Sequence, residues 1–166
     1  MVKRPDVSGL INGISNVETL HLTPNLVDVI SRSVKRVLMP VFKNLFRFSL
    51  GVRIDKVGNC SHIFLNSLQK LETLIIQDLN GYTTDVYIPL NQVKVLHVLG
   101  YRGTTHELER LKSFTRGRKC LKLVRVEIAQ GIVVDDGKVL QIHRGLMTLL
   151  GVSVSSKCKI EVSHFI

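Results

Sequence analysis

The sequence predicts an α/β fold of short parallel strands, and three observations support this. A hexad with apolar residues at its first, fourth and sixth positions recurs five times. The fourth residue recurs every 22 to 28 residues, and a strand–turn–helix–strand pattern occupies residues 93–128. The last two apolar residues of each hexad alternate, so both point to one side of a strand. The equivalent fourth residues are Leu20, Phe48, Leu74, Leu96 and Val124.

This spacing is the L-x-x-L-x-L core of a leucine-rich repeat, whose units are about 20 to 29 residues long. We therefore expect an α/β leucine-rich-repeat solenoid, with short parallel strands on the concave face and helices and loops on the convex face. Five copies in sequence are a strong signal for this architecture, but they do not identify a ligand.

The first three connections are less regular. Residues 24–40 show an apolar helical face that Pro40 ends. Residues 51–70 are expected to form a loop with a short helix. Residues 78–92 contain the turn signal Asn80-Gly81 and an alternating tail at 85–88 that predicts a further short strand.

The fourth connection predicts a well-defined helix. Thr104 and Glu107 have the spacing of a capping box, in which each side chain accepts from the other residue's backbone. Gly117 can end the helix in a left-handed conformation. The turn from Gly100 to Gly103 is expected to reverse the chain tightly between strand and helix. The apolar face of this helix is predicted to hold Leu108, Leu111 and Phe114.

The last part of the chain predicts one more helix and one more strand. Asp135-Asp136 should cap a helix over 135–150, which Gly151 stops. Residues 158–162 alternate and should form the final edge strand. The apolar stripe of the helix is predicted to be Val139, Leu140, Ile142, Leu146, Leu149 and Leu150.

Composition limits the classes of protein that fit. The 166 residues are enough for one domain or part of one, and 45% of them are hydrophobic. No run reaches the roughly 18 apolar residues of a membrane helix, and the N-terminus lacks the apolar region of a signal peptide. Three distant cysteines, Cys60, Cys120 and Cys158, favour a reducing compartment, the cytoplasm or nucleus.

The segment from Val93 to Ile128 resembles the FBD domain of plant F-box/leucine-rich-repeat proteins. This resemblance implies leucine-rich repeats over 1–92, starting inside the array, and an FBD domain over 93–166 that continues the solenoid. The residues that carry it are Gly100, Gly103, Thr104, Glu107, Leu108, Leu111, Phe114, Cys120, Leu121 and Val126.

The family resemblance also implies a function. It implies the substrate-recognition part of an SCF-type E3 ubiquitin ligase, a protein-binding role without catalytic chemistry. In that family an F-box docks the Skp-type adaptor. Only 16 residues precede Val17 here, and they do not resemble an F-box. We therefore expect no adaptor contact by this chain, and a truncated family member without a ligase role, either a competitor or non-functional, is an alternative.

The residues that alternate with the core positions are expected to face a protein substrate on the concave side. Five strands about 4.8 Å apart span roughly 20 Å, which suits a polypeptide segment better than a small metabolite. The predicted partner-binding residues are Thr19, His21, Arg47, Ser49, Thr73, Ile75, Gln77, Val95, His97, Leu99, Leu123, Arg125 and Glu127.

Other classes of site are disfavoured. His21 and His97 lie three strands apart, roughly 14 Å, so they cannot share a metal ion. The cysteines have no C-x-x-C spacing, and no nucleophile elbow, phosphate loop or zinc motif is present. We therefore predict no enzyme activity and no cofactor.

The net charge of +10 leaves nucleic-acid binding as a less favoured alternative. The basic segment around Arg116, Arg118, Lys119 and Lys122 is either a docking patch for an anionic partner or a solvated helix end.

Overall fold

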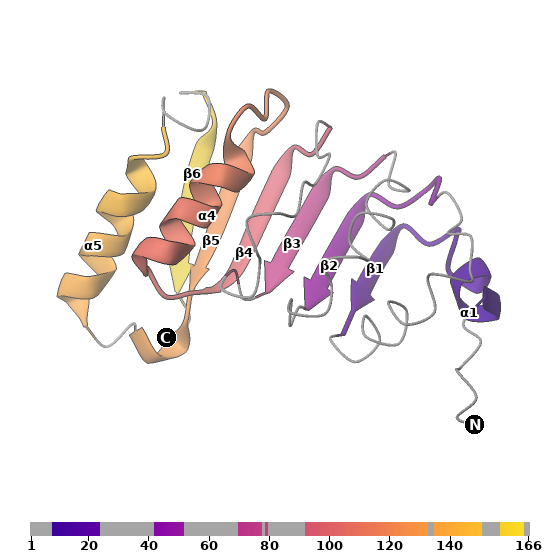
Figure 1. The fold of residues 1–166 in the computed structure, drawn as a ribbon, viewed down its shortest axis with the longest axis horizontal. Coiled ribbons are helices and arrows are strands. Elements are labelled where there is room, and N and C mark those ends of the chain that lie inside the picture. Colours follow the sequence, from indigo (N-terminus) through magenta and orange to yellow (C-terminus); the bar gives the residue numbers. More distant parts are fainter. Residues whose placement is uncertain are drawn as a thin grey trace.

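The computed structural model describes residues 8–23, 42–51, 70–77, 79, 92–132, 135–150 and 157–164. Within these residues, six strands form one all-parallel sheet in the order β1-β2-β3-β4-β5-β6 (Figure 1). The strands are β1 Thr19–Leu22, β2 Arg47–Gly51, β3 Thr73–Gln77, β4 Val95–Tyr101, β5 Leu123–Ile128 and β6 Lys159–His164. The helices are α1 Ser8–Gly13, α4 Thr105–Thr115, the 3-10 helix η3 Gln130–Ile132 and α5 Asp136–Met147.

Several expectations lie outside the described residues. These are the helix over 24–40, most of the connections 51–70 and 78–92, the cysteine at 60 and the glycine at 151.

The register of the sheet confirms the predicted equivalence of the hexads. Leu20 pairs with Phe48, and the pairing continues through Leu74, Leu96 and Val124. Ile160 on β6 extends the same row, which confirms the predicted final strand at the edge of the sheet. From Phe48 to Val124 these side chains are at most 2% exposed. They form one continuous apolar row.

A carbonyl directly before each of the strands β1, β2, β3 and β4 helps to fix this register. The Glu18 carbonyl accepts hydrogen bonds from the backbone N–H of Phe46 and of Arg47, at 2.9 and 3.2 Å. The equivalent carbonyls of Phe46, Glu72 and Lys94 each accept two N–H groups in the same way, from the first residue of the next strand and from the residue before it. Each hexad therefore enters the sheet at the same position relative to its neighbour.

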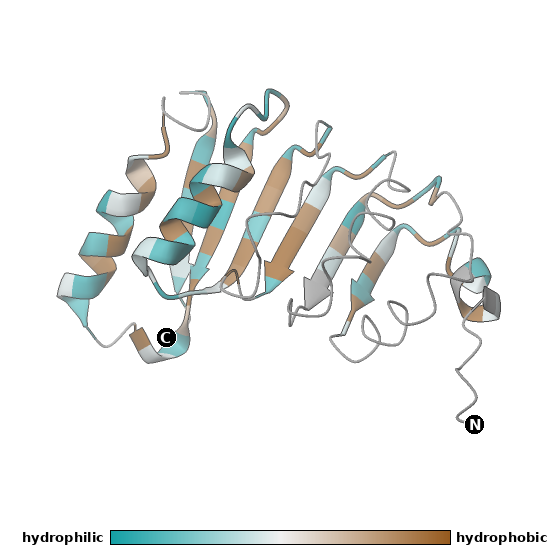
Figure 2. Cartoon of the chain, in the orientation of Figure 1, coloured by the Kyte–Doolittle hydropathy of each residue, from teal (hydrophilic) through white to brown (hydrophobic). Residues whose placement is uncertain are grey.

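Helices α4 and α5 lie on one face of the sheet beside β4, β5 and β6 (Figure 1). Leu111 of α4 is fully buried, and Ile142 and Leu146 of α5 belong to the same core as the inward strand residues. Figure 2 shows apolar positions alternating with polar ones along β5. This alternation follows because successive side chains of a strand point to opposite faces.

The predicted apolar stripe of α5 is wrong at Leu140, which is 52% exposed. Ile142 and Leu146 are four residues apart and share one helical face, whereas Leu140 lies two residues before Ile142 and points to the other side. The helix also ends earlier than predicted, at Met147. There the Thr148 hydroxyl donates to the Gly145 carbonyl, and the N–H of Leu149 bonds three residues back to Leu146.

The predicted capping box of α4 is confirmed. The Glu107 N–H donates to Oγ1 of Thr104, and the Thr104 N–H donates to Oε2 of Glu107, both at 3.1 Å. The Arg102 N–H also donates to this carboxylate at 3.1 Å. Glu107 is only 1% exposed, so it organises the whole turn between β4 and α4.

Gly103 is required by packing as well as by the turn. Its φ is +78°, in the left-handed region, and a Cβ there would lie 2.3 Å from Cγ1 of Ile142 on α5. The backbone of the turn therefore touches α5 where no side chain fits. Gly117 has φ +73° after α4, which confirms the predicted left-handed residue there.

Candidate functional site

Alternate strand residues point away from α4 and α5 and form what we call the open face. The predicted site residues fall on it in rows that follow the register of the sheet. The first row is Thr19, Arg47, Thr73, Val95, Leu123 and Lys159. The second row is His21, Ser49, Ile75, His97, Arg125 and Glu161.

The third row is interrupted. Gln77 pairs with Leu99, but the register shifts between Val98 and Tyr101, and Glu127 then pairs with Ser163 on β6. All the predicted site residues thus share one face of one sheet. Their role in binding a partner stays a prediction.

Ser49 presents little surface for a partner, because it is only 6% exposed. Its short side chain lies in the second row between those of His21 and Ile75, which are larger. His21, Arg47 and Arg125 are exposed. A partner on this face would therefore meet the neighbours of Ser49 before Ser49 itself.

Lys159 and Glu161 were missing from the predicted site. The repeating hexad did not reveal them, because Lys157 takes the place of its first apolar residue. The alternation of residues 158–162 was the available signal, since it predicts a strand whose other face carries Lys159 and Glu161.

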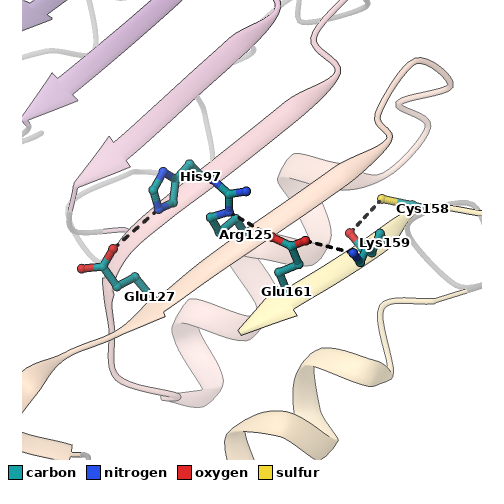
Figure 3. Close-up of polar contacts among 6 residues, drawn as sticks. All are labelled: His97, Arg125, Glu127, Cys158, Lys159 and Glu161. Carbon is teal, nitrogen blue, oxygen red and sulfur yellow. Dashed lines mark hydrogen bonds and ion pairs between the residues drawn. The ribbon is translucent and has the colours of Figure 1, made fainter. Parts of the chain in front are cut away.

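The polar groups at the β4–β6 end of the open face form two clusters (Figure 3). Glu161 accepts from Nε of Arg125 and lies at the same distance, 3.1 Å, from Nζ of Lys159. These two hydrogen bonds hold the pKa of the Glu161 carboxyl below its usual value. One carboxylate is thus shared by two cations on neighbouring strands.

The second cluster is His97 with Glu127, whose Nε2 and Oε2 atoms are 3.6 Å apart. Burial is the main reason that the pKa of His97 is lowered, and the nearby charge of Arg125 adds to it, while Glu127 acts in the opposite direction. Nε2 of His97 is buried without a hydrogen bond. The neutral imidazole is therefore favoured here.

Aliphatic side chains occupy the middle of the open face. Ile75, Val95, Leu99 and Leu123 are each partly exposed on the three strands β3, β4 and β5. Arg47 and His21 lie on the β1–β2 side, and the Arg125–Glu161 cluster lies on the β6 side. An apolar centre between polar flanks offers van der Waals contact together with hydrogen bonding.

In the described part of the chain, no group of three His, Cys, Asp or Glu residues could hold a metal ion. His21 and His97 are on β1 and β4, as the repeats predict. Cys120 and Cys158 are free thiols, and burial raises the pKa of the Cys158 thiol. Among the described helices, none is long and apolar enough to cross a membrane.

Comparison with known proteins gives clear relatives. The chain is 51% identical over 162 residues to F-box/LRR-repeat protein At3g60040 of Arabidopsis thaliana, covering 98% of the chain and 36% of that protein. It is 45% identical over 128 residues to F-box/LRR-repeat protein At1g06630 of the same plant, covering 76% of the chain and 32% of that protein. Putative F-box protein At3g44060 is 35% identical over 165 residues, covering 95% of the chain and 38% of that protein.

The chain therefore spans between 32% and 38% of the length of these relatives. No family model and no solved structure matches it.

Proposed function

Because this chain belongs to the F-box/LRR-repeat proteins of plants, we propose that it is a protein-binding module that recognises the substrate of an SCF-type ubiquitin ligase. The observation that carries the proposal is the open face, with its apolar centre and polar flanks on adjacent parallel strands. The partner would be a segment of protein, and this chain would supply recognition without chemistry.

The size of the open face supports a polypeptide partner. Six strands about 4.8 Å apart span about 24 Å, which is the length of roughly seven extended residues. In this proposal the sheet is the concave side of a leucine-rich-repeat solenoid, with repeats over 1–92 and an FBD domain over 93–166. The family relationship and the hexad register support that arrangement.

In the same proposal, the substrate is bound by the open face, and the Skp-type adaptor is bound by an F-box rather than by residues of this chain. Co-precipitation of the 166-residue chain with a Skp-type adaptor tests this division. No capture is expected. Capture would show that the chain contacts the adaptor directly.

The test of the open face uses His97→Ala and Arg125→Ala in the full chain. Crosslinking in a plant extract followed by mass spectrometry identifies a partner, and titration of the purified partner gives its affinity for each variant. We expect each variant to bind several-fold more weakly, because each removes a polar group beside the apolar centre.

Arg144→Ala is the matched control, because Arg144 is exposed on α5 and lies away from the open face. It should leave the affinity unchanged. Unchanged affinity in both open-face variants would overturn the proposed site.

A further inference from the structure

The amino-terminal edge of β4, β5 and β6 carries a set of cations, one of which, Lys159, also belongs to the first row of the open face. We call Lys94, Arg116, Lys119, Lys122 and Lys159 the basic rim. The Lys122 N–H donates to the Lys94 carbonyl at 2.8 Å, and the Lys159 N–H donates to the Lys122 carbonyl at 2.9 Å. Lys94 and Lys122 therefore lie next to each other directly before β4 and β5, and Lys159 begins β6 one register position further along, as the partner of Leu123. Arg116 and Lys119 come from the turn between α4 and β5, at the same end of the sheet (Figure 1).

The basic rim has more positive charge than its acidic neighbours balance. Residues 116–125 contain five cations and no acid. Glu72 pairs with Lys94 at 3.0 Å, and Glu161 is shared by Lys159 and Arg125. Arg116, Lys119 and Lys122 are exposed. No ion pair among the described residues engages Lys119 or Lys122.

The basic rim adjoins aliphatic surface. Val95 and Leu123 directly follow Lys94 and Lys122 and are register partners in the first row of the open face. Both are partly exposed. A ligand that crosses this edge would therefore meet cations first and then aliphatic side chains.

We propose that the protein segment bound on the open face carries acidic residues that lie against the basic rim, beside aliphatic residues that contact Val95 and Leu123. This inference rests on the proposed function and names the chemistry of its partner. Charge complementarity argues for acidic residues. The aliphatic side chains of the first row argue for a polypeptide. Proteins that bind single-stranded nucleic acids present aromatic side chains on which the bases stack. Among the described residues, Phe46 is the one exposed aromatic.

The test compares two labelled peptides by fluorescence anisotropy with the full chain. One peptide has two Glu and two Leu residues in a Gly/Ser background, and the other has Gln in place of Glu. We expect the Glu peptide to bind at least about fivefold more tightly at low salt, with the preference falling as salt is added.

The rim variant is Lys119→Glu/Lys122→Glu, and its matched control is Lys138→Glu/Arg144→Glu on α5. All four residues are exposed, and both double variants change the net charge equally. The preference for Glu over Gln should disappear in the rim variant and persist in the control. Circular dichroism checks that both variants are folded.

Equal binding of the two peptides to the parent chain would overturn the inference, as would equal loss of the preference in both double variants. A single-stranded oligonucleotide that binds more tightly than the Glu peptide, and is released by the rim variant, would assign the rim to nucleic acid instead. If a natural partner depends on His97 and Arg125 but not on the basic rim, the proposed function stands and this inference falls.

Discussion

Nε2 of His97 on β4 lies 3.6 Å from Oε2 of Glu127 on β5, and each side chain is 21% exposed. This separation is longer than a hydrogen bond. Burial acts most strongly against protonation of His97, the charges of Arg125 and Arg47 act in the same direction, and Glu127 favours protonation, so that the pKa of His97 is lowered. The open face thus holds a half-buried imidazole that resists taking up a proton.

That resistance makes the free energy of unfolding depend on pH. The folded state holds the pKa of His97 below its ordinary value of 6.5, so the unfolded chain takes up this proton at higher pH than the folded chain. The stabilising contribution is complete above pH 6.5 and is lost as the pH falls through the folded-state pKa. We expect the Tm to fall from pH 7 to pH 5, and to fall less in His97→Gln.

Thermal melts followed by circular dichroism measure this difference. The pKa of Glu161 is also lowered, but the stability linked to it is lost below its ordinary pKa of 4.5, in a separate range of pH. Identical slopes for the parent chain and His97→Gln between pH 7 and pH 5 would contradict the prediction.

Because Leu96 lies in the buried apolar row, we expect a large loss of stability when its side chain is shortened to that of alanine. Leu96 is 2% exposed and lies between Leu74 and Val124. Leu96→Ala should cost about 2 to 5 kcal/mol, because it leaves a cavity in the core. Lys94→Ala, which removes only an exposed ion pair with Glu72, should cost less than about 1 kcal/mol. Chemical denaturation of both variants gives the two values, and similar values would show that Leu96 is not a core residue.

Alanine substitutions at Gly103 and Gly100 distinguish the cost of a steric overlap from the cost of backbone strain. Gly103→Ala should destabilise the chain by about 2 to 4 kcal/mol, because its Cβ would overlap Ile142 and its φ is +78°. Gly100 also has a positive φ, +69°, so Gly100→Ala would strain the backbone in the same way, but nothing lies within 4 Å of the added Cβ. It should cost about 1 kcal/mol. Equal losses in denaturant melts would mean that α5 does not pack against Gly103.

Glu107 is expected to be a structural carboxylate. Glu107→Gln replaces one accepting oxygen with a donor, where the N–H groups of Arg102 and Thr104 need acceptors. The expected cost is about 1 to 3 kcal/mol. Glu109→Gln in the same helix is the control, because that side chain is 65% exposed and forms an ion pair with Lys112 on the surface of α4. It should change stability by less than about 0.5 kcal/mol. If Glu109→Gln lowers the free energy of unfolding as much as Glu107→Gln does, the Glu107 carboxylate has no special structural role.

The strands and their register could be predicted well from the sequence, because the apolar positions of the hexad are the positions whose side chains pack in the core. Leu20 and Phe48 are partners in the sheet because both occupy the same position of their hexads. The capping box at Thr104 was equally predictable from the sequence, since all its partners lie within five residues. Local periodicity and local hydrogen bonds are the parts of a fold that a sequence displays directly.

Contacts between distant residues were not predictable in this way. Arg125 and Glu161 are 36 residues apart, and only the pairing of β5 with β6 brings them together. Gly103 was recognised as a turn residue, but its contact with Ile142 depends on how α5 docks. Leu140 is hydrophobic, but its position around the helix places it on the exposed side of α5.

The paired hydrogen bonds at the carbonyls of Glu18, Phe46, Glu72 and Lys94 have a consequence for how such a chain can change length. Successive hexads are separated by 22 to 28 residues, yet each carbonyl accepts its two N–H groups at the same offset from the next strand. The register of the described strands is therefore kept although the number of residues between hexads varies. A single residue inserted between Glu72 and Thr73, inside a hexad, would turn every side chain of β3 to the opposite face, so that its core residues and its open-face residues would change places.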